Sequence, residues 1–368
     1  MFGEKGEIDM KKILLLTLHS QNNNFGSVLQ AHSLYEFLEE LGYNVTVLNY
    51  QPYYSNGAIS PKMFVKKILT NMLFLPSFLI RTSRFDKIVN SKKLTKKISQ
   101  KSKLPEIASE YDIFMIGSDQ VWNPHYLCGQ DDAYFLKFTD SMNKVSYAAS
   151  IGTKNISDSD LDRIVRDLKE FKYVSLREND SCKRLAKHGL VNAKYVLDPV
   201  FLHDIKYYRA IESKKISERG YILAYVIHRD KFISEVIDEF SKLMNKKVIQ
   251  IGGFAKKCNS DKFPRSAGPE EFLALIDHAD FIVTSSFHGT AFAHIYNKQF
   301  AVVMPNGNTL RLENILETAG TEDRVVRDIS DVKNMLQHID YKEVNEKISD
   351  KRKDSIEYLK DMLDSMEN

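Results

Sequence analysis

The order of apolar and polar segments along the chain predicts alternating strands and helices. A short apolar run at 11–18 is followed by a polar loop, an amphipathic helix ending at Gly42, and a β-branched, aromatic run at 43–50. Glycine commonly follows the last turn of a helix. Because strand, helix and strand follow one another from the start, we expect a doubly wound α/β fold with a parallel sheet.

This alternation continues in two successive series. The first series has further strands expected at 111–117, 144–150, 173–178 and 193–198. The second has strands expected at 221–227, 246–253, 280–286 and 300–305, with helical patterns at 231–244 and 269–279. The alternation breaks near 203–218, and a chain of 368 residues is too long for one ordinary core. We therefore predict two Rossmann-like lobes.

These patterns divide the chain into four parts. The polar leader at 1–10 is expected to be flexible, and the N-terminal lobe to occupy 11–205. The C-terminal lobe is expected at 219–339. The remaining segment, 340–368, contains a charged amphipathic pattern for a helix that could cross back to the first lobe.

The bulk composition narrows the class of protein. A formal net charge of +3 is too small to predict nucleic-acid binding. The three cysteines form no CxxC pair and no HExxH motif is present, so neither a disulfide framework nor a metal site is expected. The sequence also lacks a P-loop and a GxGxxG fingerprint, and we predict no cofactor. No apolar run reaches the roughly 18 residues of a membrane span, and a cytoplasmic location is expected.

One segment departs from this balance of charge. Between 61 and 103 the chain has twelve Lys or Arg residues and one acid, Asp86, around the apolar patch MLFLPSFLI. Two interpretations stay open. The segment is either a solvated helical insertion in the first lobe, or a surface for anionic lipid or a diphosphate-bearing acceptor. The second interpretation would place the protein peripherally at the inner face of the membrane.

The stretch FIVTSSFHGTAFAH ends an expected strand and begins a helix. Functional groups gather at the carboxyl ends of parallel strands, and a helix N-terminus suits an anion such as phosphate. His288 can exchange a proton near neutral pH, and Gly289 would allow a ligand to approach the backbone. We predict an anion site formed by Ser285, Ser286, His288, Gly289 and Thr290.

Three other loops at expected strand or helix ends add candidates. Arg177, in YVSLREND, offers a planar fork for a carboxylate or phosphate, with a local salt bridge as the alternative. The loop IGSDQVWNP has the mixture of groups that suits a sugar, with a helix or turn cap as the alternative role of Asp119. Its candidates are Gly117, Ser118, Asp119, Gln120 and the flat face of Trp122. Asp198, in VLDP, reads as a structural strand end.

The loop NNNFGSVLQ leads into the first helix. Its residues Asn24, Phe25, Gly26 and Ser27 either bind a ligand or cap that helix. The residues alone leave these two roles open.

Together and in this order, the loops resemble the polysaccharide pyruvyl transferase family. The matching stretches are NNFGSVLQAHSL, IGSDQVWNP, YAASIG, SLREND, VLDPVF and SSFHGTAFAHIYNKQF, which span roughly 23–300. The resemblance implies a GT-B-like fold, in which two Rossmann lobes face a cleft. It also implies transfer of the enolpyruvyl group of phosphoenolpyruvate onto sugar hydroxyls, which forms a pyruvate ketal and releases phosphate.

The resemblance further implies roles for individual residues. His288 takes the position of the functional histidine, and Arg177 that of the donor-binding arginine. We expect Asp119 to be the second catalytic residue, and the loops at 24–27 and 117–122 to face the acceptor. That acceptor is a sugar linked to a nucleotide, a lipid or a polymer. The first loop reads Phe25-Gly26-Ser27 where many relatives have Tyr-Gly-Ala, a mild departure.

Two other functions stay open at this point. One is a glycosyltransferase of the same two-lobe form that uses a nucleotide sugar, for which Glu313 is a candidate ribose ligand. The other is a non-catalytic glycan-binding relative.

Overall fold

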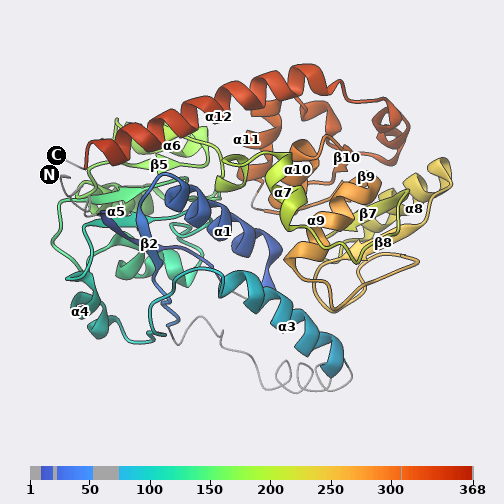
Figure 1. Ribbon diagram of the computed structural model, residues 1–368. Helices are drawn as coiled ribbons and strands as arrows, with labels where there is room; N and C mark the ends of the chain where they lie inside the picture. Colours follow the sequence, from blue (N-terminus) through green and yellow to red (C-terminus); the bar gives the residue numbers. More distant parts are fainter. Residues whose placement is uncertain (1–9, 20–22, 53–73, 308, 367–368) are drawn as a thin grey trace, which may run out of the picture.

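The structure is a computed structural model, and it describes residues 10–19, 23–52, 74–307 and 309–366. In this part of the chain, two four-stranded parallel sheets build two α/β lobes, as predicted (Figure 1). The expected leader lies outside the described residues except for Met10. Of the helices in the described part, none is long and apolar enough to cross a membrane.

The sheet of the N-terminal lobe has the strand order β2-β1-β3-β4. Its strands are β1 (Lys12–Leu16), β2 (Asn44–Val47), β3 (Ile113–Ile116) and β4 (Lys144–Ser146). Single bridges continue it to a short parallel pair, β5 (Ser175–Leu176) and β6 (Lys194–Tyr195). The helices of this lobe are α1 (Phe25–Glu40), α3 (Leu75–Val89), α4 (Leu104–Ala108), α5 (Asp158–Leu168) and α6 (Asn179–Lys187). Helix α7 (Ile205–Ile211) leads into the second lobe.

The sheet of the C-terminal lobe has the strand order β10-β9-β7-β8. Its strands are β7 (Tyr221–Tyr225), β8 (Val248–Ile251), β9 (Ala279–Thr284) and β10 (Gln299–Val302). Its helices are α8 (Lys231–Met244), α9 (Pro269–His278), α10 (Phe287–Ile295) and α11 (Leu310–Ala319). Each predicted strand overlaps an observed one, and the helix predicted at 231–244 coincides with α8. Strands β7 and β8 are buried at every position, which fits a parallel sheet covered on both faces.

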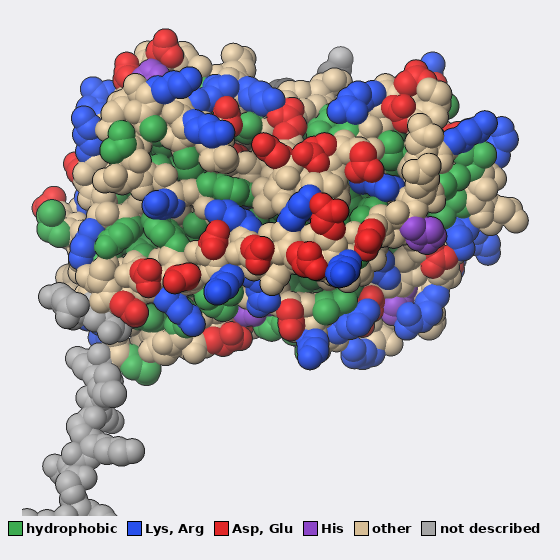
Figure 2. Space-filling view, turned by 90° about the horizontal axis from the view of Figure 1, so that it is seen from above, with side chains coloured by type: hydrophobic (Ala, Val, Ile, Leu, Met, Phe, Trp, Pro, Cys, Tyr) green, Lys and Arg blue, Asp and Glu red, His purple; other side chains and the backbone are tan. Residues whose placement is uncertain are grey.

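Helix α12 (Tyr341–Asp364) runs along both lobes (Figure 1). At its start, the Tyr341 hydroxyl donates a hydrogen bond to the Ala293 carbonyl in the C-terminal lobe, at 3.3 Å. Toward its end, Leu359, Met362 and Leu363 are fully buried in the core of the N-terminal lobe. Seen from above, the face that α12 covers carries acidic and basic side chains in alternation (Figure 2). This helix therefore ties the two lobes together.

Helix α3 makes a second connection between the lobes. Arg81 is buried, lies 4.7 Å from the centre of the Phe25 ring, and donates hydrogen bonds to the carbonyls of Asn23 (3.0 Å) and Ala267 (3.3 Å). Lys87 forms an ion pair of 2.5 Å with Glu270 of α9.

The described part of the basic segment is therefore largely bound to the protein itself. Residues 61–73 of that segment lie outside the described residues. Within the rest, six cations contact protein groups: Arg81, Arg84, Lys87, Lys92, Lys93 and Lys101. Burial lowers the pKa of Lys92 to about 7, which further reduces the positive charge.

Candidate functional site

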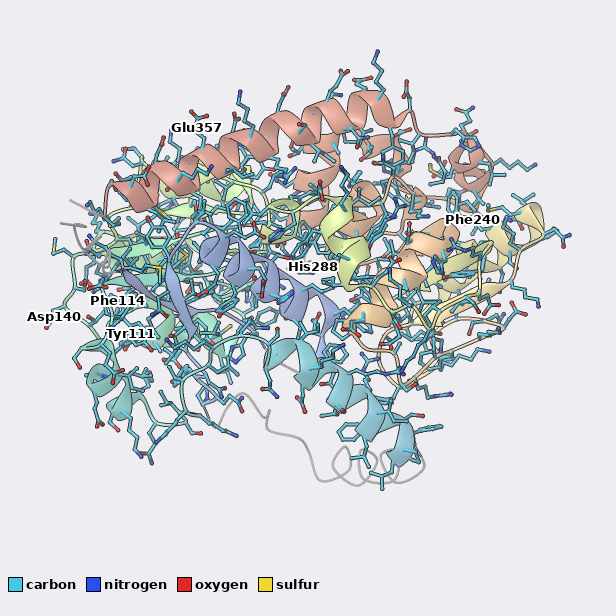
Figure 3. The ribbon with its side chains drawn as sticks, in the orientation of Figure 1. Tyr111, Phe114, Asp140, Phe240, His288 and Glu357 are labelled. Carbon is cyan, nitrogen blue, oxygen red and sulfur yellow. The ribbon has the colours of Figure 1, made fainter. Side chains whose placement is uncertain are left out.

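A cavity of about 740 Å³ lies between the lobes. Its N-terminal wall comes from the start of α1 and the loop after β3, and its C-terminal wall from the loops after β7 and β9 and the start of α11. All these sheet strands point their carboxyl ends at the cavity, which is where open α/β sheets bind ligands. Its volume falls in the range of about 300–1,000 Å³ typical of small-molecule sites. His288 lies at this junction of the lobes (Figure 3).

Asp119 is the carboxylate of the N-terminal wall. Its backbone φ of 76° is unusual for a residue with a side chain, and such conformations concentrate at functional sites. The Ser27 hydroxyl donates to its Oδ2 at 2.8 Å, and Nη1 of Arg311 lies 3.4 Å from its Oδ1. Burial raises the pKa of this carboxyl, but Arg177 and Arg311 outweigh burial and hold the pKa below its ordinary value. Asp119 is therefore ionised at neutral pH.

Arg177 and Asp198 form a buried ion pair beneath the cavity. Nη2 of Arg177 lies 2.7 Å from Oδ2 of Asp198 and also donates to the Ser118 hydroxyl. Nε2 of His288 lies 3.7 Å from the same Asp198 oxygen. Burial raises the pKa of Asp198, but Arg177 and His288 overcome this effect and lower the pKa to about 2. Asp198 is thus a residue of the site, which its assignment as a structural strand end missed.

Several nitrogens of basic side chains at this junction have no hydrogen-bond partner in the described part of the chain. They are Nε and Nη1 of Arg177, Nε2 of His288 and Nε of Arg311. Phe287 lies among them, with its ring centre 4.9 Å from the Arg177 guanidinium carbon and 5.8 Å from that of Arg311. A buried donor without a partner costs about 1–3 kcal/mol, so an anion that accepts from these groups would bind favourably.

Gly26 permits the close approach of the two walls. A Cβ atom at Gly26, in the first turn of α1, would lie 2.0 Å from Nδ1 of His288. Any side chain there would therefore displace the imidazole. The preceding Asn24 caps α1, because its Oδ1 accepts from the amides of Gly26 (2.9 Å) and Ser27 (3.3 Å).

Seven of the predicted site residues line the cavity. They are Asn24, Ser27, Asp119, Gln120, Ser285, Ser286 and His288. The others lie behind its walls. These are Phe25, Gly26, Gly117, Ser118, Trp122, Arg177, Gly289 and Thr290. Arg177 lies 4.0 Å from the lining residue Asp119 and donates to the Ser118 hydroxyl. Phe25 stacks on Phe272 in the core, at 4.7 Å between ring centres.

Trp122 cannot offer the sugar-stacking face expected from the sequence. Its side chain is fully buried, lies 6.0 Å from the Phe135 ring, and donates from Nε1 to the Tyr134 carbonyl at 2.8 Å. Aromatic rings that do line the cavity belong to Tyr126, Tyr225 and Phe287.

Gly289 and Thr290 have packing roles in this structure. A Cβ atom at Gly289 would lie 2.2 Å from Oγ1 of Thr284, so the close approach concerns strand β9 rather than a ligand. The hydroxyl of Thr290 is fully buried and donates to the Ser286 carbonyl at 3.2 Å.

Sequence reasoning missed Arg311, although it considered the neighbouring Glu313. Arg311 lines the cavity, whereas Glu313 pairs with Lys154 and accepts a hydrogen bond from Thr309. The available signal was a row of polar residues three and four apart in the helix, Arg311, Asn314 and Thr318.

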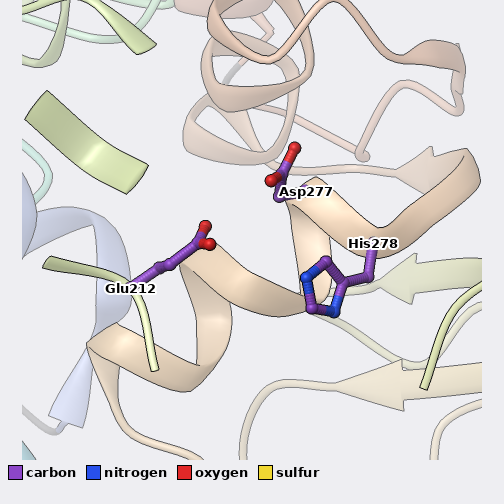
Figure 4. Close-up of side chains that lie close together, drawn as sticks. All are labelled: Glu212, Asp277 and His278. Atoms are coloured by element: carbon purple, nitrogen blue, oxygen red, sulfur yellow. The ribbon is translucent and has the colours of Figure 1, made fainter. Parts of the chain in front are cut away.

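Three potential metal ligands lie together outside the cavity. The ligand atoms of Glu212, Asp277 and His278 are within 4.8 Å of one another (Figure 4). They precede β9, at the opposite end of that strand from the cavity. Asp277 already accepts two hydrogen bonds from Arg209, at 2.9 and 3.1 Å, and Lys298 lies 3.7 Å away. Because the protein's own cations balance this cluster, we assign it no ligand.

Comparisons with known proteins agree with this architecture. A family model described as polysaccharide pyruvyl transferase matches residues 24–307. No curated protein sequence matches the chain. Among solved structures, a putative UDP-N-acetylglucosamine 2-epimerase from Listeria monocytogenes has a TM-score of 0.55 at 10% identity and covers 92% of this chain and 90% of its own. The Neisseria meningitidis UDP-GlcNAc 2-epimerase bound to UDP-GlcNAc has a TM-score of 0.54 at 14% identity, with 95% and 99% covered. At these identities the likeness shows the fold alone, which is GT-B-like.

The contact between Gly26 and His288 gives a first prediction. Gly→Ala within a helix normally stabilises it by about 0.5–1 kcal/mol, but here the added methyl group overlaps the imidazole. Gly26→Ala should lower the free energy of unfolding by about 1–3 kcal/mol and shift the His288 imidazole signals in NMR spectra. Gly42→Ala, at the other end of α1, should leave those signals unchanged. Unaltered His288 signals in Gly26→Ala would contradict the contact.

The low pKa of Asp198 gives a second prediction. A folded-state pKa of about 2 against an ordinary value of 3.8 stabilises the folded protein above pH 3.8. This stability, about 2 kcal/mol, should be lost as the pH falls from about 4 to 2. Urea unfolding at pH 5 and pH 2.5 should reveal this loss. Asp198→Asn should be less stable at pH 5, because Arg177 loses its partner, but should lose less on acidification. Equal losses in both proteins would refute the assignment.

Proposed function

Because the chain belongs to the polysaccharide pyruvyl transferase family, we propose that it transfers the enolpyruvyl group of phosphoenolpyruvate to two hydroxyls of a sugar. The product would be a pyruvate ketal, and phosphate would be released. The observation that carries this proposal is the pair of unpartnered nitrogens on two basic side chains that line the cavity, His288 and Arg311, next to the ionised Asp119. Such a site suits a small donor with a carboxylate and a phosphate.

The proposed reaction moves two protons. Each acceptor oxygen forms a bond to C2 of the donor, and the C2–O bond to phosphate breaks. One hydroxyl proton ends on the methylene carbon, which becomes the methyl group of the ketal, and the other ends on the phosphate. Protonation of the methylene carbon leaves an oxocarbenium-like C2 for the first hydroxyl to attack.

We assign His288 to the phosphate side and Asp119 to the acceptor side. His288, in the first turn of α10, would stabilise or protonate the departing phosphate. Asp119 is ionised and faces the cavity, so it can accept a hydroxyl proton. Arg177, with a side chain only 1% exposed, would support His288 through Asp198 and Asp119 through its own charge, 4.0 Å away.

For the sugar acceptor we propose the outer part of the cavity. His125, Tyr126 and Leu127 line it from the N-terminal lobe, and Ile227 and His228 from the C-terminal lobe. The side chains of Tyr126 and Leu127 are exposed, at 41% and 54%, and offer the apolar faces on which sugars pack. The carrier of the acceptor, a nucleotide, a lipid or a polymer, stays a prediction.

A cytoplasmic location is also proposed, which the free, buried cysteines support. The peripheral membrane contact through 61–103 has less support, because the cations of its described part largely bind protein groups.

Phosphate release from phosphoenolpyruvate tests the proposed function. His288→Ala should lower its rate by about 10²–10⁴, the usual contribution of a positioned acid or base. Release is measured with free, nucleotide-linked and lipid-linked sugars as acceptors. His338→Ala removes an exposed histidine outside the cavity and should leave the rate unchanged.

A wild-type rate in His288→Ala would exclude its role in the chemistry. If the wild-type protein releases no phosphate with any acceptor but is stabilised against heat by UDP-sugars, the proposed function is wrong. The glycosyltransferase alternative would then be favoured.

A further inference from the structure

Arg311 lies beyond residue 307, where the match to the family model ends. It occupies the first turn of α11, on the face that meets the N-terminal lobe. Two residues on the same face anchor the helix there. Asn314 donates to the Arg177 carbonyl at 3.2 Å and accepts from the Asn179 amide at 2.9 Å, and Thr318 shares a hydrogen bond of 2.7 Å with Tyr195. These contacts fix α11, and therefore Arg311, against the site.

Arg311 is the guanidinium that a ligand in the cavity can reach. Its side chain is 16% exposed and lines the cavity, whereas that of Arg177 is 1% exposed and lies behind the wall. Nε of Arg311 is buried and has no hydrogen-bond partner in the described part of the chain.

The contact of Arg311 with Asp119 is weak for an ion pair. A single Nη1–Oδ1 distance of 3.4 Å joins them, whereas charge-assisted N–H···O bonds are typically about 2.7–2.9 Å and Arg–carboxylate pairs are often bidentate. Asp119 has other partners to retain, since it accepts from the Ser27 hydroxyl at 2.8 Å and from the Gln120 amide at 2.9 Å. A bidentate anion in the cavity would therefore compete well for Arg311.

We propose that Arg311 binds the anionic donor and exchanges Asp119 for the donor's carboxylate or phosphate. This inference rests on the proposed function and adds a donor-binding residue outside the region matched by the family model. The exchange has a consequence for catalysis. Once Arg311 has left, Asp119 loses a neighbouring cation and becomes a stronger base toward the acceptor hydroxyl. Donor binding would thus prepare the site for the acceptor.

Isothermal titration calorimetry with phosphoenolpyruvate tests the binding role. Arg311→Ala should weaken binding about 10- to 100-fold, which is the usual loss of affinity when a hydrogen bond to a charged group is removed. Arg311→Lys, which keeps the charge but loses the fork, should give an intermediate dissociation constant. Arg219→Ala is the matched control. It removes the same charge from an exposed position before β7, at the opposite end of that strand from the cavity, and should bind as the wild type does.

The exchange of partners predicts that a substitution of Asp119 has the opposite effect on phosphoenolpyruvate binding. Asp119→Asn removes the competitor for Arg311 and should tighten phosphoenolpyruvate binding several-fold while abolishing turnover. In the double variant Arg311→Ala/Asp119→Asn this gain should disappear, because the two residues then no longer interact.

The outcomes separate this inference from the proposed function. If the wild type binds phosphoenolpyruvate and Arg311→Ala binds it equally well, Arg311 is not a donor ligand, although the proposed function stands. If Asp119→Asn binds more weakly than the wild type, the exchange is refuted. If the wild type itself does not bind phosphoenolpyruvate, the proposed function fails, and the inference fails with it.

Discussion

The buried pair of Arg177 and Asp198 is the interaction on which the rest of the site depends. Both residues belong to the N-terminal lobe, and both side chains are buried, so water cannot take the place of either partner. Separating them would leave an uncompensated buried charge, which typically costs about 3–5 kcal/mol. The same Asp198 oxygen faces His288 of the C-terminal lobe, so the pair also positions the imidazole. A structural ion pair and the histidine proposed to be catalytic are thus parts of one arrangement.

At the junction of the lobes, an acid of one lobe faces a basic group of the other in two places. The N-terminal lobe supplies two carboxylates, Asp198 and Asp119, and the C-terminal lobe sets a basic group against each, His288 and Arg311. Arg177 lies between the two carboxylates, 2.7 Å from one and 4.0 Å from the other. Both acids stay ionised despite burial, chiefly because Arg177 is near. The arrangement requires that the lobes be held in place, which α3 and α12 do.

The sequence predicted the fold well because apolar periodicity reports directly on burial. The predicted strands are present, and the loops at 24–27, 117–120 and 285–288 meet at one cavity, as parallel topology requires. Tertiary packing, which periodicity does not show, decides whether a single aromatic residue in a loop is buried and which charged groups pair. Trp122 was therefore misassigned, and Asp198 and Arg311 were missed. For the same reason the twelve cations of 61–103 left two interpretations open, and the pattern gave no sign that Arg81 and Lys87 join the lobes.

We propose that both lobes together bind one small anionic donor, and a crystal structure of the protein with phosphoenolpyruvate would show whether they do. We expect the donor to lie in the cavity with its anionic groups within hydrogen-bond distance of His288 and Arg311, and Arg311 to have separated from Asp119. A donor bound to one lobe alone, or away from both side chains, would contradict it.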